Sequence, residues 1–195
     1  RRVDSLRDEA VKLDELAMDL ERASDASSIM EVEAQAARHY WQSIAQVLPP
    51  EYGFKGRDQD GKDSLNLMLN YGYGVLRYMV EKVLLIHGFD PYAGFLHADK
   101  SGKPSLTLDI MEPFRPIVDK ALVFAGLKVD VMNGFLSYES RASIIKTITE
   151  EFQNRVYLGA RSTTPLKVLN NFIEGLASYL RDGVNNLDPP VIRWG

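Results

Sequence analysis

Apolar residues recur at helical spacing along most of the chain. Between residues 3 and 22 they stand three or four positions apart, which predicts an amphipathic helix: Leu6, Ala10, Leu13, Leu16, Ala17 and Leu20. Ser28 and Glu31 have the spacing of a capping box, so we predict a second helix over 28–47. A third is predicted over 63–87, capped by Asp63 or Ser64.

The second half of the chain continues this pattern. We predict further helices over residues 105–125, 140–157 and 165–182. Pro113 and Pro116 should kink or restart the first of these, because proline removes a helical hydrogen bond. Thr164 followed by Pro165 is a favoured way to begin a helix. Asn133-Gly134 indicates a short β pairing within residues 127–138.

These elements predict a mostly all-α fold. Two stretches rich in proline, glycine and charge, 48–64 and 88–105, read as irregular connections, and the tail 183–195 is irregular too. The chain has 195 residues, 45% of them hydrophobic, which is enough to bury a core. We therefore expect a single helical domain over residues 1–195.

Composition narrows the classes of function. There is no cysteine, which excludes disulfides, thiolate metal sites and cysteine nucleophiles. The sequence contains no run of eighteen apolar residues, which a membrane-spanning helix would need. Its N-terminal residues also lack the apolar core of a signal peptide, so we expect a cytoplasmic protein. The net charge of −4 argues against general coating of nucleic acid, although a local basic groove is compatible with it.

Glu33 interrupts an apolar stripe of the second predicted helix. At 100° per residue it shares a face with Ile29, Ala37, Tyr40 and Ile44. A carboxylate on a core-facing stripe is costly unless it is paired or binds a cation. Glu33 is therefore either a partner in a buried ion pair, a residue at the edge of the core, or a ligand.

The segment GFLHADKSGKPSLTLDIMEPFRP, residues 94–116, sets an imidazole near two carboxylates. Asp109 and Glu112 are three apart, hence neighbours on a helix, and His97 lies on the preceding loop. Either this is a solvated acidic face with a surface histidine, or it is a cation site. Imidazole with carboxylates suits Mg²⁺ or Mn²⁺ better than zinc, but the spacing matches no standard metal motif.

The third predicted helix carries one polar stripe. Its members, at helical spacing, are Asn66, Asn70, Tyr73, Arg77 and Glu81. They form either a hydrogen-bonded seam or the lining of a site. Basic residues nearby include Arg57, Lys103 and Arg115, for which solvated charge is the default and phosphate contact the alternative.

Three blocks of this sequence together resemble a known family. MEVEAQAARHYW, FKGRDQDGKDSLNLMLNYGYGVL and GFDPYAGFLHADKSGKPSLTLDIMEPFRP are similar, in order and spacing, to the catalytic domain of the CRISPR-associated adaptation integrases (Cas1). The resemblance covers about residues 5–182, and the third block is its most specific part. It implies a mostly helical catalytic domain, preceded in the family by a β-rich dimerisation domain that this chain lacks.

The resemblance also implies a site. The family's metal ligands carry over as Glu33, His97 and Glu112, with Asp109 at a further acidic position of the same site. The cofactor implied is Mg²⁺ or Mn²⁺. Two positions depart from the pattern: Ala34 replaces a frequent glycine, and Glu112 stands where some members have aspartate. Arg57, Asn66, Lys103 and Arg115 are our candidates for contacts with DNA.

The implied activity is that of a metal-dependent DNA integrase and endonuclease, which inserts new spacers into a CRISPR array by phosphodiester transesterification. Its implied partners are double-stranded or branched DNA and the small adaptation protein Cas2, with a homodimer or higher oligomer in the full-length protein and no membrane. Two alternatives stay open. One is a related integrase of a mobile element or of a reverse-transcriptase fusion. The other is a non-catalytic helical domain that binds DNA or another partner.

Overall fold

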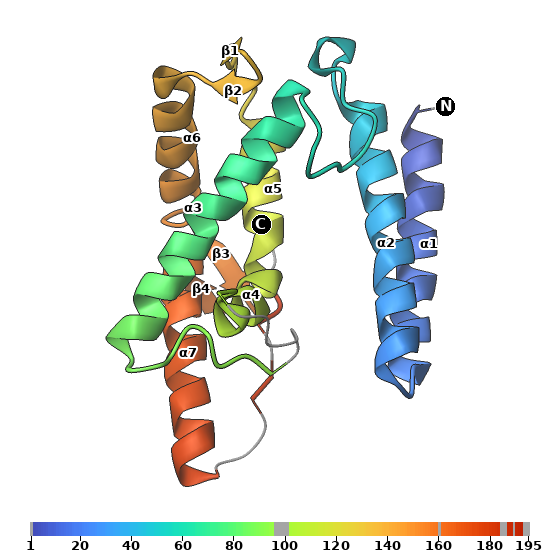
Figure 1. Ribbon diagram of the computed structural model, residues 1–195. Helices are drawn as coiled ribbons and strands as arrows, with labels where there is room; N and C mark the ends of the chain where they lie inside the picture. The colour runs from blue at the N-terminus through green and yellow to red at the C-terminus, as the bar shows by residue number, and fades with distance from the viewer. Residues whose placement is uncertain (1, 96–101, 160, 184–186, 189, 193–195) are drawn as a thin grey trace. The chain divides into compact units, whose positions relative to one another are not determined.

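The computed structural model describes residues 2–95, 102–159, 161–183, 187–188 and 190–192. The chain divides into two compact units, an N-terminal unit of residues 1–67 and a C-terminal unit of residues 68–195. From the sequence we predicted a single domain over residues 1–195. The fold is mostly helical, as predicted, with four short strands among the described residues (Figure 1).

The N-terminal unit is built on a helical hairpin. Helices α1 (Arg2–Arg22) and α2 (Ala26–Val47) run antiparallel to one another (Figure 1). Glu9 Oε2 lies 2.7 Å from His39 Nδ1 and so joins the two helices. The predicted capping box was misplaced by three residues: Asp25 caps α2 by accepting from Ser28 N at 2.8 Å. Asp and Ser are about equally good caps, because the side-chain oxygen of either can accept from a free helix amide, so the cap preference alone did not decide between them.

A loop connects α2 to the next long helix. It contains a short 3₁₀ turn, η1 (Pro50–Tyr52), and the ring of Phe54 packs edge-on against Trp41 at 5.9 Å between centroids. Helix α3 (Ser64–Ile86) follows. Asp63 accepts from Asn66 N at 3.0 Å, which confirms the predicted cap.

The predicted helix 105–125 is broken in the structure. It consists of α4 (Ser105–Met111), the 3₁₀ turn η2 (Glu112–Phe114) and α5 (Arg115–Phe124). The break falls at Pro113, and Pro116 stands in the first turn of α5. Both prolines act as the sequence predicted, because neither can donate the amide that a continuous helix requires.

The remaining elements mix correct and incorrect predictions. Strands β1 (Val131–Met132) and β2 (Phe135–Leu136) pair around Asn133-Gly134, whose φ angles are 53° and 80°, as predicted. Helix α6 (Tyr138–Glu151) ends six residues before its predicted end. Strands β3 (Val156–Leu158) and β4 (Arg161–Thr163) form a hairpin there, which was missed. Helix α7 (Pro165–Asp182) matches the prediction, including its Thr164 cap.

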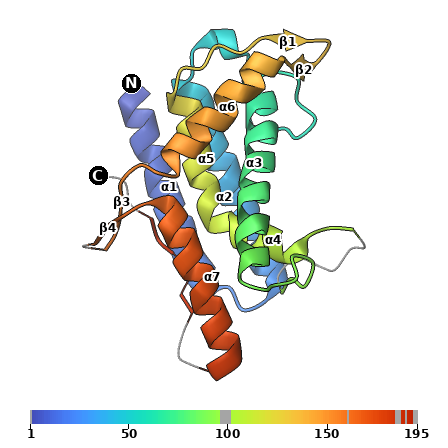
Figure 2. The ribbon, with the colours of Figure 1, turned by 90° about the vertical axis from the view of Figure 1, so that its left-hand side faces the viewer.

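The C-terminal unit has a close-packed core where α3, α5 and α6 meet (Figures 1 and 2). Gly72 of α3 approaches α5 and α6 closely. A Cβ placed on it would lie 2.8 Å from Leu122, 2.9 Å from Val118 and 3.1 Å from Ile148. Lys120 Nζ pairs with Glu151 at 2.7 Å and ties α5 to α6 at the edge of this core.

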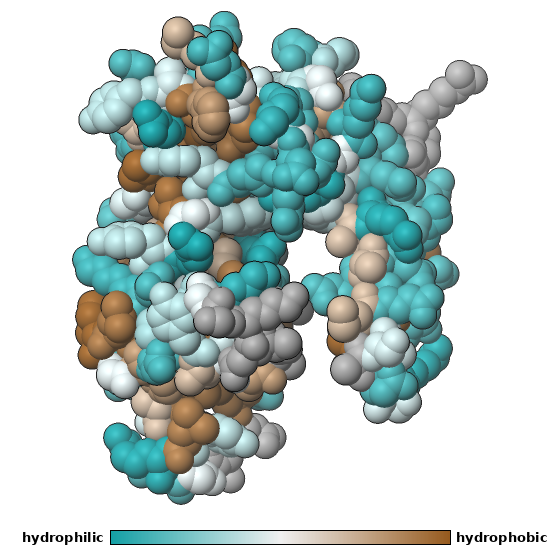
Figure 3. Space-filling model, viewed as in Figure 1, coloured by the Kyte–Doolittle hydropathy of each residue, from teal (hydrophilic) through white to brown (hydrophobic). Residues whose placement is uncertain are grey.

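The surface is predominantly hydrophilic on the face of the N-terminal unit seen in Figure 3. The C-terminal unit exposes a larger apolar patch at the end of α3, where Leu85 and Ile86 are 59% and 69% exposed. In the part of the chain that is described, no helix has both the length and the apolar character needed to cross a membrane.

We predict that Gly72→Ala lowers the free energy of unfolding by about 1–3 kcal/mol, because the added methyl group overpacks the core. Gly74→Ala, in the same helix, is the matched control: no described atom lies within 4 Å of the added Cβ. Its expected effect has the opposite sign, a stabilisation of about 0.5–1 kcal/mol. Urea denaturation measures both. Equal effects of the two substitutions would contradict the close packing at Gly72.

Candidate active site

The chain that leads toward His97 is held along α4 by hydrogen bonds. Gly94 N donates to Ser105 Oγ at 3.0 Å, and Ser105 Oγ donates to the carbonyl of Tyr92 at 2.5 Å. Thr107 N donates to the carbonyl of Pro91 at 3.3 Å. Phe95 N donates to Asp109 Oδ2 at 2.7 Å. The last described residues before His97 therefore have a position that is set by α4.

Gly94 makes this contact possible. A Cβ at this residue would lie 2.6 Å from Ser105 Cβ and 2.7 Å from the Ser105 carbonyl carbon. Backbone atoms cannot move aside as the end of a flexible side chain does. The absence of a side chain thus lets the loop lie directly on the first turn of α4.

Asp109 is buried, with only 5% of its surface exposed. This excludes the alternative that Asp109 and Glu112 belong to a solvated acidic face. A buried carboxylate is unfavourable unless hydrogen bonds replace its lost hydration, and the amide of Phe95 supplies one such bond. Asp109 is therefore placed as a positioning residue for the loop that carries His97.

Glu112 has a different environment one turn later. It begins η2, just where Pro113 breaks the helix, and its side chain is 37% exposed. Its Oε1 lies 2.9 Å from Arg115 Nη2. The two acidic residues thus divide their roles: Asp109 faces inward to the loop, and the Glu112 carboxylate reaches solvent.

A chain of polar contacts extends from Glu112 into the unit. The Arg115 guanidinium carbon lies 5.0 Å from the centre of the Tyr73 ring, a cation–π geometry. Tyr73 Oη donates to Asp119 Oδ1 at 2.5 Å, and Asp119 is only 4% exposed. Among the described atoms, Arg115 Nε is buried without a hydrogen-bond partner. Arg115 is thereby held beside Glu112 with a donor to spare.

Asp109 and Glu112 line a cavity of about 870 Å³ in the C-terminal unit. Aromatic and aliphatic side chains make up much of its wall, among them Phe89, Phe95, Ile110, Phe172, Leu176 and Tyr179. The carboxylates therefore stand at an opening large enough for a ligand of substantial size.

Glu33 is exposed, which corrects the expectation that it faces the core. The face of α2 that packs against α1 is adjacent to the face that carries Glu33. It includes His39, which contacts Glu9 of α1. Its half-buried positions in this stretch are Val32, Gln35, Ala36 and His39. Ile29, Glu33 and Ala37 are all exposed, so the N-terminal unit leaves the Glu33 carboxylate accessible.

The four candidates for DNA contacts differ in burial and in the contacts of their side chains. Asn66 is 1% exposed, and its amide is used inside the loop: it accepts from Arg57 Nη1 and Asp58 N and donates to the Gly56 carbonyl and Asp63. Asn66 is thus an organiser of the loop, and the predicted DNA contact is wrong because DNA cannot reach it. Arg57 is half-buried at that loop, Arg115 is held by Glu112, and Lys103 is exposed.

His97 lies outside the described residues. Within the described ranges, no group of three His, Asp or Glu side chains lies close enough to hold a metal ion. The three-ligand set of Glu33, His97 and Glu112 therefore stays a prediction. The geometry does connect Asp109 and Glu112 with the loop before His97.

Comparison with known proteins assigns the chain to a family. The family model described as CRISPR associated protein Cas1 matches residues 1–153, which include Glu33, His97, Asp109 and Glu112. The chain belongs to the Cas1 family. The resemblance found in the three sequence blocks is thereby confirmed.

Relatives of the chain agree with this assignment. CRISPR-associated endonuclease Cas1 2 of Pyrobaculum aerophilum is 45% identical over 133 residues, which cover 68% of this chain and 44% of that protein. The chain thus spans about half the length of the curated relative. A casposase bound to integration product matches with a TM-score of 0.77 at 25% identity, over 94% of this chain and 63% of that one. A chain of a Cas6-RT-Cas1–Cas2 complex shares the fold, with a TM-score of 0.81 at 22% identity, over 94% and 22%.

Some residues around this candidate site were missed from the sequence. Gly94, Ser105 and Asp119 had no assigned part. An acidic residue at helical spacing from two site carboxylates, opposite a tyrosine of another helix, was the available signal. The contacts of Gly94 with Ser105 leave no comparable pattern in the sequence.

We predict that Asp109→Ala destabilises the protein by about 1.5–3 kcal/mol, because it removes the hydrogen bond that the Phe95 amide donates to the buried carboxylate. Asp90→Ala is the matched control, since Asp90 accepts from Tyr92 N at 2.9 Å in the same loop but is exposed. Its effect should stay within about 0.5 kcal/mol. Denaturation gives the stabilities, and NMR hydrogen exchange should show faster exchange at Phe95 in the first variant only. Unchanged exchange at Phe95 would refute the positioning role.

Proposed function

We propose that this chain is the catalytic part of a divalent-metal-dependent DNA integrase and endonuclease of CRISPR spacer acquisition. The observation that carries the proposal is the division of roles at α4 and η2. Buried Asp109 fixes the loop that leads to His97, and exposed Glu112 follows one turn later. This arrangement occurs in a chain of the Cas1 family, within the matched residues 1–153.

The residues fit a hard divalent cation. Glu33 and Glu112 are accessible carboxylates, and His97 supplies an imidazole; such oxygen and nitrogen ligands suit Mg²⁺ or Mn²⁺. We propose that these three residues hold the metal. When bound, the cation polarises the phosphoryl oxygen and neutralises charge that develops on it.

The proposed reaction exchanges one phosphodiester for another. A terminal 3′-hydroxyl of a short DNA fragment attacks the phosphorus atom of a phosphodiester at the edge of a repeat. The new P–O bond forms as the bond to the displaced 3′-oxygen breaks, and the proton lost by the attacking hydroxyl is balanced by the one the leaving oxygen gains. Because one ester replaces another, no activated cofactor is needed. The chain has no cysteine, and no covalent enzyme intermediate is required.

Arg115 is suited to hold a phosphate near the reacting group. Its guanidinium is oriented by Tyr73 and Glu112, and its side chain is 33% exposed, so its outer nitrogens can reach a phosphate. Lys103 follows the loop of His97 and is exposed. Both would position the backbone of DNA without reading its sequence. We propose double-stranded or branched DNA as the substrate and, from the Cas1–Cas2 neighbour, Cas2 as a partner.

A second candidate function is integration for a mobile element. The structural similarity to a casposase bound to integration product supports this second candidate. The chemistry at the site would be the same, and only the origin of the inserted DNA would differ. The two are separated by the substrate: a CRISPR repeat array or the ends of an element.

We predict that Glu112→Gln and Glu33→Gln each reduce strand transfer by at least about a hundredfold, because each removes a charge from the metal shell while keeping the shape of the side chain. Glu31→Gln is the control, since Glu31 is also exposed on α2 and differs from Glu33 only in the direction it points. Strand transfer on a branched DNA substrate with Mn²⁺ measures activity, and circular dichroism checks the fold.

His97→Ala belongs in the same assay and should be as inactive as Glu112→Gln. Full activity in all three variants would overturn the proposed function. Loss of activity in Glu31→Gln as well would show that the assay responds to charge on α2 in general, and the specific part assigned to Glu33 would then be wrong.

A further inference from the structure

One stretch of the C-terminal unit carries only positive charge. Residues 152–173 include Arg155, Arg161 and Lys167 and no aspartate or glutamate. The chain as a whole has a net charge of −4, so the net charge of this stretch is opposite in sign to that of the chain. The proposed contacts at Arg115 and Lys103 do not use it.

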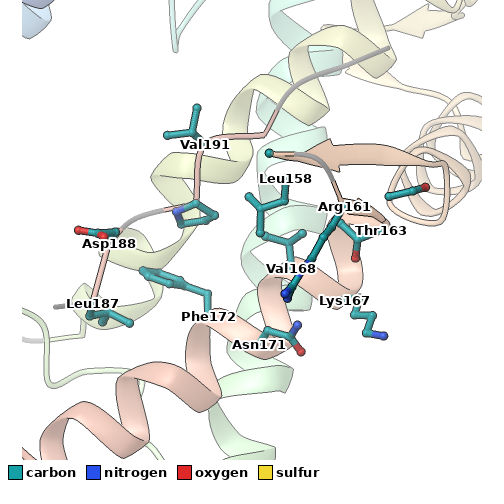
Figure 4. A pocket seen from close by; sticks show the side chains of 13 residues that line it. Leu158, Arg161, Thr163, Lys167, Val168, Asn171, Phe172, Leu187, Asp188 and Val191 are labelled. Atoms are coloured by element: carbon teal, nitrogen blue, oxygen red, sulfur yellow. The ribbon is translucent and has the colours of Figure 1, made fainter. Parts of the chain in front are cut away.

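The fold gathers this stretch around one cavity. Strands β3 and β4 form the hairpin, and α7 begins directly after it (Figure 2). Arg161 and Lys167 line a cavity of about 680 Å³ together with Ser162, Thr163 and Asn171. In Figure 4 the Arg161 side chain extends over the start of α7, toward Asn171, and Lys167 lies on the same side. The cavity therefore has a wall of cationic and hydrogen-bonding groups.

The charges of this wall are not neutralised by the protein. Arg161 and Lys167 are exposed and form no ion pair with any described residue. By contrast, Lys120, Lys146 and Arg181 of the same unit each have a carboxylate within 4 Å. The one carboxylate that lines the cavity, Asp188, lies on the opposite side with Leu187 and Val191 (Figure 4).

Side chains rather than backbone must make the contacts here. The amides at the start of α7 already have acceptors: Leu166 N donates to the Phe152 carbonyl, Lys167 N to Thr164 Oγ1 and Val168 N to the Thr164 carbonyl. A ligand is thus met by the guanidinium, ammonium, hydroxyl and amide groups of the wall. These are the groups that contact phosphate oxygens in protein–DNA complexes.

We propose that the β3–β4 hairpin and the first turns of α7 form a second DNA-binding surface, which holds the sugar–phosphate backbone of duplex DNA through Arg161 and Lys167. The inference rests on the proposed function, since it takes DNA as the ligand. A chain with net negative charge repels DNA unless positive charge is concentrated locally, and this surface supplies that concentration. Because it offers only backbone contacts, it binds without sequence preference.

The test is the salt dependence of DNA binding. Binding of a fluorescein-labelled DNA duplex to the intact chain is followed by anisotropy over a range of NaCl concentrations. Each lost phosphate contact should reduce the slope of log K against log salt by about 1, so Arg161→Gln/Lys167→Gln should reduce it by about 2. Lys146→Gln/Arg181→Gln is the matched control. It removes the same charge from exposed residues of the same unit that are ion-paired, and its slope should change by less.

The outcomes are distinguishable from failure of the proposed function. An equal slope change in both double variants, or none in either, would overturn the second surface. Weakened binding of poly-glutamate but not of DNA would identify an acidic protein as the partner and would also overturn it. Strand transfer by the intact chain, with its loss in Glu112→Gln, tests the proposed function separately. If the intact chain binds no DNA at all, both inferences fail.

Discussion

The attachment of residues 91–95 to α4 depends on the buried carboxylate of Asp109. Asp109 lies in α4 with 5% of its surface exposed and accepts the amide of Phe95 at 2.7 Å. A buried charge of this kind is tolerated only with strong hydrogen-bond partners, and those partners must be held in place. Gly94 and Ser105 complete the attachment by letting the loop lie directly against the helix. The segment that leads to His97 is thereby fixed relative to Glu112.

Pro113 and Arg115 determine what happens beyond this anchor. The proline ends α4, so Glu112 sits in a 3₁₀ turn and its carboxylate reaches solvent at a cavity of about 870 Å³. Arg115 is oriented from two sides, by Glu112 and by the ring of Tyr73, which in turn is hydrogen-bonded to buried Asp119. The buried Asp109 and Asp119 are thus used in hydrogen bonds within the unit, while the Glu112–Arg115 pair is partly exposed. This separation is compatible with the proposed binding of metal and phosphate at Glu112 and Arg115.

The sequence predicted the elements that depend on local signals. Thr164-Pro165 placed the start of α7, Asn133-Gly134 placed the first hairpin, and the two prolines placed the breaks around η2. It failed where tertiary packing decides. Helical periodicity alone extended α6 through Val156, which the structure uses in a strand, and it gave Glu33 a buried face because the direction of α1 packing cannot be read from α2. Asn66 was misjudged for the same reason: its burial depends on the loop that folds over it.

Glu33, His97 and Glu112 are proposed to hold one divalent metal ion. The most direct measurement is titration of the intact, ¹⁵N-labelled chain with Mn²⁺, following paramagnetic broadening of amide signals. We predict saturable broadening around Phe95 and Glu112 and, at the same Mn²⁺ concentration, around Glu33, with both lost in Glu112→Gln. Broadening that never saturates, or that leaves either Glu33 or Glu112 unaffected, would contradict the proposed set of ligands.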